Sequence, residues 1–108
     1  MDPEQLKILT NGLVATTEEG TAQAARVAGI RVASKTGTAQ VGAKSRPRQI
    51  AWLVGFLPAN APRFAFAVMV EGDWGEDLHG GEDAAPVAGK MFSQVYAEAT
   101  STLTQTNR

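Results

Sequence analysis

The chain has 108 residues, a formal net charge of −1 and 44% hydrophobic residues, and it contains no cysteine. This length accommodates one domain with a modest core, and the apolar content argues against an intrinsically disordered chain. The lack of cysteine excludes disulfides and thiolate metal sites, and it removes redox chemistry as a guide to the compartment. No apolar run approaches membrane-spanning length and no signal-peptide pattern opens the sequence, so we expect a soluble segment.

The N-terminal segment predicts an amphipathic helix. Asp2 is suited to cap the helix, Pro3 fits the first helical position, and Gln5 stands where a capping box reaches back. The apolar residues that follow recur at helical spacing on one face: Leu6, Leu9, Leu13 and Val14. Gly20 is expected beyond the helix end, and residues 21–29 are compatible with either a helical turn or an extended lead-in.

Three strands are predicted next, at residues 31–41, 50–57 and 64–70. The turn of residues 58–63 is so short that the last two strands must be antiparallel neighbours. A meander of three strands is the simplest arrangement of these elements.

A second helix is predicted near the C-terminus, capped by Asp83 or Glu82 and with Pro86 in its first turn. Its expected buried stripe comprises Ala88, Met91, Phe92, Val95, Tyr96 and Ala99. The expected fold class is therefore α+β, with an antiparallel three-stranded meander flanked by N- and C-terminal helices.

The predicted strands differ in the polarity of their faces. In the third strand both faces are apolar, which predicts a strand covered on both sides; these residues are Phe64, Phe66, Val68 and Val70 on one face and Ala65, Ala67 and Met69 on the other. The first strand has one polar face, as expected of a strand that borders a site; this face comprises Ser34, Thr36, Thr38 and Gln40.

Charge is divided unevenly along the chain. Residues 26–48 include six bases (Arg26, Arg31, Lys35, Lys44, Arg46 and Arg48) and no acid. Residues 71–83 include six acids (Glu71, Asp73, Glu76, Asp77, Glu82 and Asp83) and no lysine or arginine. A basic segment can favour anionic ligands. The alternative is a pair of solvated loops of opposite sign, and the sequence leaves both interpretations open.

The first strand carries the most informative stretch of the chain, Lys35-Thr36-Gly37-Thr38. These residues combine an ammonium group, two hydroxyls and an unobstructed backbone. Such a combination suits a carboxylate-bearing ligand whose carbonyl group is under attack. At average residue usage, the motif occurs by chance in roughly one chain in a thousand of this length. The surrounding sequence has to decide whether the motif is functional or a chance occurrence.

The surrounding sequence resembles the C-terminal part of the transpeptidase domain of penicillin-binding proteins. The resemblance rests on the motif and its continuation to Gln40, on residues 51–58, on the strand ending in Val70-Glu71, and on Gly80-Gly81 followed by Ala84-Ala85-Pro86. These matches follow the order of the family from Pro3 to about Glu98. The Thr-Ala-Gln continuation looks more like the monofunctional, class B members.

The resemblance implies acyl transfer in peptidoglycan cross-linking. In the family, a serine attacks a D-alanyl-D-alanine stem peptide, an amine of a neighbouring strand resolves the acyl-enzyme, and β-lactams mimic the peptide. Lys35 would supply positive charge near the substrate carboxylate and support proton transfer, while Thr36 and Thr38 would hydrogen-bond that carboxylate. The backbone N–H of Thr38 would form half of the oxyanion hole. Gly37 would leave room for a ligand along the strand edge.

The chain departs from the family in two motifs. No serine opens an S-x-x-K or S-x-N sequence, and in the family both motifs lie N-terminal to the K-T-G strand. We therefore expect residues 1–99 to be the C-terminal portion of a transpeptidase domain, followed by a polar tail at residues 100–108, and we expect this chain to be inactive alone. The parent protein would be extracytoplasmic, although this chain carries no signal.

The resemblance also implies an incomplete sheet. The family's sheet has five strands, two of them from the N-terminal side of the domain, so the strand at 64–70 would be an open apolar edge. We expect this edge to bind the missing N-terminal part or a second copy of the chain. The rival hypothesis is a non-catalytic remnant that binds a partner through this edge, and a third is a small α/β protein that carries the motif by coincidence.

Other charged clusters are interpreted as solvated loops. His79 lies among Glu76, Asp77 and Glu82, but the spacing fits neither a calcium loop nor a zinc helix. The basic residues at 44–48 lack interleaved aromatic residues, which favours an exposed turn over a nucleic-acid contact. We therefore expect no metal, no cofactor and no nucleic-acid partner.

Overall fold

The computed structural model describes residues 1–106, with side chains described through residue 100. It contains two α-helices and one three-stranded antiparallel sheet, which confirms the predicted α+β class. In chain order the elements are α1 (Pro3–Glu18), a 3-10 helix (Gln23–Ala25), β1 (Ala33–Val41), β2 (Arg48–Leu57), β3 (Phe64–Glu71), a π-helical turn (Gly80–Ala84) and α2 (Ala85–Thr106).

Helix α1 begins as the sequence predicts. The Asp2 side chain accepts a hydrogen bond of 2.9 Å from the backbone N–H of Gln5, and Pro3 occupies the first turn. Helix α2 begins differently, because a π-helical turn precedes it. There Asp83 accepts a hydrogen bond from the backbone N–H of His79 at 2.8 Å, so its carboxylate holds the turn rather than capping α2 itself.

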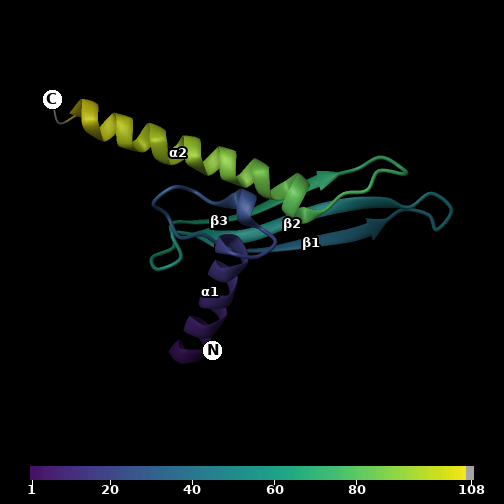
Figure 1. Cartoon of the computed structure of the whole chain (residues 1–108), viewed down its shortest axis with the longest axis horizontal. Helices are drawn as coiled ribbons and strands as arrows, with labels where there is room; N and C mark the ends of the chain where they lie inside the picture. The colour runs from purple at the N-terminus through teal and green to yellow at the C-terminus, as the bar shows by residue number, and fades with distance from the viewer. Residues whose placement is uncertain (107–108) are drawn as a thin grey trace.

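The sheet has the order β1-β2-β3, so β1 and β3 are its edges. Helix α2 runs along one face, while α1 projects away on the other side (Figure 1). On the α2 side, Leu53 and Leu57 of β2 are fully buried against residues that include Ala85, Ala88 and Phe92. This side of the sheet contains the main core of the chain.

The opposite face of the sheet, which we call the open face, is largely uncovered in the described part of the chain. Val54 and Met69 are 46% and 50% exposed there. Helix α1 covers only one end of this face, where Val14 packs with Ala33 and Phe56. The prediction that both faces of β3 are covered is therefore wrong for residues 1–106, because nothing in this part of the chain reaches the middle of the open face.

The predicted stripe of α2 is also only partly buried. Ala88 and Phe92 are buried and Tyr96 is half-buried, but Met91 and Val95 are 44% and 39% exposed, and Ala99 is exposed. The helix contacts the sheet through a narrower face than its apolar pattern suggested. No helix within residues 1–106 is long and apolar enough to cross a membrane.

Candidate functional site

The Lys35–Thr38 motif lies in the middle of the edge strand β1. Within the described residues β1 pairs only with β2, so its other edge is unpaired. The register pairs Thr36 with Leu53 and Lys35 with Val54. Because paired residues share a face, the two threonines point to the α2 side, and Lys35 and Gly37 point to the open face.

Two hydrogen bonds fasten β1 to the segment around the end of α1. The hydroxyl of Thr36 lies 2.8 Å from that of Thr21, and the hydroxyl of the buried Ser34 lies 2.6 Å from that of Thr17. The sequence analysis placed Ser34 on a polar face expected to border a site. In the structure Ser34 is buried, and its hydroxyl joins β1 to α1 instead. The sequence analysis missed Thr17 and Thr21; the only available signal was that a buried hydroxyl needs a partner.

A pair of glycines supports the motif from the α2 side. A Cβ atom at Gly80 would lie 2.5 Å from the carbonyl oxygen of Trp52 and 3.0 Å from the backbone of Gly37. A Cβ atom at Gly81 would lie 2.1 Å from the carbonyl oxygen of Thr21. The π-helical turn thus crosses the sheet in direct backbone contact with Gly37, and only glycine permits this approach.

The remaining polar groups of the motif face solvent. Lys35 and Thr38 are exposed, and Lys35 Nζ donates a hydrogen bond of 2.9 Å to the carbonyl oxygen of Thr36. Thr36 is half-buried, and its hydroxyl forms a hydrogen bond with that of Thr21. A ligand lying along the free edge of β1 could therefore contact Lys35 from one face of the strand and Thr38 from the other.

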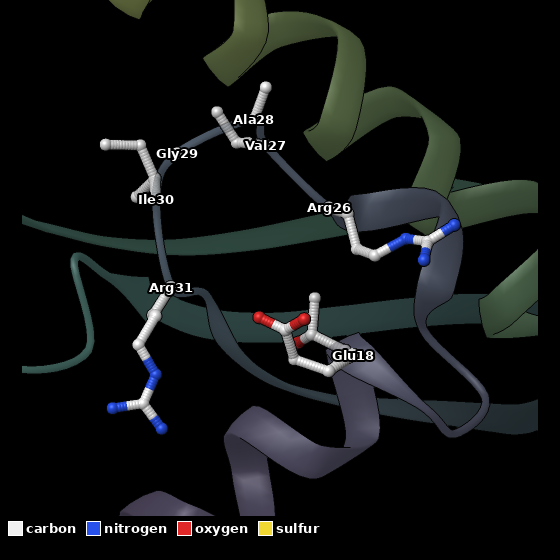
Figure 2. Close-up of a pocket in the computed structure, with 8 residues that line it drawn as sticks. Glu18, Arg26, Val27, Ala28, Gly29, Ile30 and Arg31 are labelled. Atoms are coloured by element: carbon white, nitrogen blue, oxygen red, sulfur yellow. The ribbon is translucent and has the colours of Figure 1, made fainter.

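A large hollow of the molecule lies away from the motif. It measures about 530 Å³ and is lined by Thr17, Glu18 and residues 26–31. Figure 2 shows Glu18 in the view between Arg26 and Arg31. None of residues 35–38 lines this hollow, so it is separate from the motif.

The acidic loop of residues 71–83 does not gather three acidic or histidine side chains at one point. Residues 1–106 hold no cluster of three or more histidine or acidic side chains that could coordinate an ion. His79 instead lies 3.3 Å from Asp77, and both side chains are exposed.

Comparison with known proteins assigns the family. The sequence profile described as "Penicillin binding protein transpeptidase domain" matches residues 1–93. The chain is 42% identical over 103 residues to a peptidoglycan D,D-transpeptidase PbpA of Mycolicibacterium smegmatis, and the match covers 93% of this chain and 21% of that protein. It is 40% identical over 88 residues to a peptidoglycan D,D-transpeptidase FtsI of Buchnera aphidicola, covering 79% of this chain and 15% of that protein.

Solved structures agree with the sequence relatives. The fold is similar to the transpeptidase domain of FtsI4 D,D-transpeptidase from Legionella pneumophila, with a TM-score of 0.65 and 31% identity over 77% of this chain and 32% of that one. It is also similar to a peptidoglycan synthetase from Bifidobacterium adolescentis, with a TM-score of 0.67 and 27% identity over 88% of this chain and 17% of that one. The chain spans about a fifth or less of the length of the two D,D-transpeptidases named above. It belongs to the penicillin-binding protein transpeptidase domain family.

Proposed function

We propose that this chain supplies the substrate-binding edge strand of a peptidoglycan D,D-transpeptidase. Lys35, Thr36 and Thr38 bind the carboxylate of the stem peptide or of a β-lactam, and the backbone N–H of Thr38 forms half of the oxyanion hole. The observation that carries this proposal is the position of the motif on a strand whose outer edge is unpaired within residues 1–106. An extended peptide can add to such an edge as a further strand.

The chain performs only part of this reaction. It lacks an S-x-x-K and an S-x-N sequence, so the nucleophile has to come from another segment of the domain. The relatives named as D,D-transpeptidases are several times longer than this chain, which supports a division of the site between two segments. The complete protein would act outside the cytoplasm, where peptidoglycan is cross-linked.

The experiment is a segment exchange. The chain replaces the matching segment of the M. smegmatis relative, and acylation by a labelled penicillin is followed by intact mass. We expect an adduct on the chimera and none on this chain alone. Thr38→Val in the chimera should slow acylation about ten- to a hundredfold, as expected for a hydrogen bond to a charged group. An adduct on the isolated chain, or a Thr38→Val chimera that acylates at the parent rate, would refute the proposal.

The exposed apolar residues of the open face and the edge of β3 that is unpaired within residues 1–106 favour binding of another protein segment. Met69 and Val54 of the open face are 50% and 46% exposed, an apolar surface that suits the N-terminal part of the domain. Without that part, we expect the chain to self-associate in gel filtration, and Met69→Lys to shift it toward monomer. A second candidate function, a non-catalytic remnant that binds through this edge, predicts partner binding with no acylation in the chimera.

A further inference from the structure

A second hollow lies between α1 and the turn that joins β2 to β3. It measures about 340 Å³. Three segments line it, namely α1, the residues that lead into β1, and the turn; the lining residues are Pro3, Leu6, Lys7, Thr10 and Asn11, then Arg31, then Ala59 and Asn60. None of residues 35–38 lines this hollow, so it is separate from the motif.

The three segments are joined to one another at Ala59. The backbone N–H of Ala59 donates a hydrogen bond of 2.8 Å to the carbonyl oxygen of Arg31. Ala59 is also buried in one cluster with Val14 of α1. The hollow is therefore formed before any ligand binds, as is usual for small-molecule sites.

The charge of the lining is positive. It contains two bases, Lys7 and Arg31, and no acid. Within residues 1–100, neither base forms an ion pair. Glu18 and Glu19 line neighbouring hollows together with Arg31, but Figure 2 shows the Arg31 side chain pointing away from the Glu18 carboxylate. Both cationic groups are thus available to an anion, and their positive potential attracts one.

The rest of the lining suits a polar head on an apolar stem. The side-chain amides of Asn11 and Asn60 supply N–H donors, and a guanidinium group beside them binds a carboxylate strongly. Pro3, Leu6 and Ala59 supply apolar surface, and Leu6 is 53% exposed and so accessible to a ligand. The volume is near the lower end of the range of about 300–1,000 Å³ found for small-molecule sites, which favours a small ligand over a peptide segment.

We propose that this hollow binds a small organic acid, a carboxylate on a short apolar stem. The carboxylate lies between Lys7 and Arg31, and the stem lies against Leu6 and Ala59. The proposed function does not enter this inference, because no residue of the motif belongs to the site.

The test titrates the ¹⁵N-labelled 108-residue chain with three ligands that share one stem: hexanoate, neutral hexanamide and hexylammonium. We expect hexanoate to shift the amide resonances of residues 6–11, 31 and 59–60. It should bind about two- to fivefold more tightly than hexanamide, as expected for exposed ion pairs, and hexylammonium should bind more weakly than hexanamide. Acetate should bind more weakly than hexanoate, because it has no stem that buries apolar surface.

Three variants locate the charge effect. Lys7→Gln and Arg31→Gln should each weaken the binding of hexanoate and leave that of hexanamide unchanged, and the double variant should bind the two ligands equally. Arg63→Gln is the matched control, because it removes a cation from the same β2–β3 turn without changing the lining of the hollow. This control should keep the preference for hexanoate. In the parent chain the preference should fall as salt is added, because salt screens exposed charges.

Three results would overturn the inference. The first is equal binding of hexanoate and hexanamide to the parent chain, or a loss in Arg63→Gln as large as that in Arg31→Gln. The second is a set of hexanoate shifts confined to residues 35–38, which would leave the proposed function intact. The third is binding of the capped dipeptide acetyl-leucyl-glutamyl amide without binding of hexanoate, which would assign the hollow to an acidic segment of a partner protein.

Discussion

The two faces of the sheet differ in how completely this chain covers them. On the α2 side, helix α2, the 3-10 helix and the π-helical turn cover Leu53, and Gly80 and Gly81 allow close backbone contact. On the open face, α1 covers one end and leaves Val54 and Met69 exposed. Within the described residues, the α2 side is therefore covered, whereas the open face presents an apolar surface that is largely uncovered.

Two adjacent residues of β2 give the largest expected contrast between the faces. Leu53→Ala should lower the free energy of unfolding by about 2–5 kcal/mol, because it leaves a cavity in the core. Val54→Ala should change it by less than about 0.5 kcal/mol, because Val54 points to the open face. Denaturant unfolding of both variants measures the difference. Equal losses would mean that the open face is covered in solution.

The glycine contact under the motif gives a somewhat smaller effect. Gly80→Ala should destabilise the chain by about 1–3 kcal/mol, since the added methyl group meets the backbone of Trp52 and Gly37. Gly12→Ala is the matched control, because no atom lies within 4 Å of its Cβ position in α1. That control should stabilise the chain by about 0.5–1 kcal/mol. A Gly80→Ala variant as stable as the parent would show that the π-helical turn is not packed on β1.

The sequence predicted the elements well because their signals are local. The cap at Asp2, the turn after Leu57 and the alternation in β1 all lie within a few residues, and the observed strands differ from the predicted ones by two residues at most. The predicted position of the motif on a strand is confirmed for the same reason. Its roles in binding and catalysis remain predictions.

The sequence failed where the answer depends on distant residues. The apolar pattern of β3 indicates that both of its faces are suited to burial. It does not indicate whether the segment that buries each face lies in the same chain. The Thr21–Thr36 bond joins two residues 15 positions apart, and the segment around Thr21 has no periodicity to indicate its path. Met91 and Val95 extend the apolar stripe of α2 beyond the width of the surface on which it packs.

The hydrogen bond between Thr21 and Thr36 tests how much the contacts on the α2 side stabilise the motif strand. Thr21→Val and Thr36→Val should each cost about 0.5–1.5 kcal/mol, and the double variant should cost less than their sum, because both remove one hydrogen bond. Thr38→Val is the control on the same face of β1, and it should change stability by less than about 0.5 kcal/mol. Additive losses in the double variant would mean that the two hydroxyls act independently.

The smallest expected effect lies at the hairpin end of the open face, where Arg48 and Glu71 form an ion pair of 2.7 Å with side chains 44% and 45% exposed. Exposed pairs contribute only about 0.2–1 kcal/mol, and salt screens them. A double-mutant cycle with Arg48→Gln and Glu71→Gln should give a coupling energy in that range at low ionic strength, and it should fall toward zero in about 1 M salt. A coupling that is larger and insensitive to salt would mean that the pair is shielded from water. The open face would then be covered, by self-association or by another part of the chain, and the contrast between Leu53 and Val54 should disappear with it.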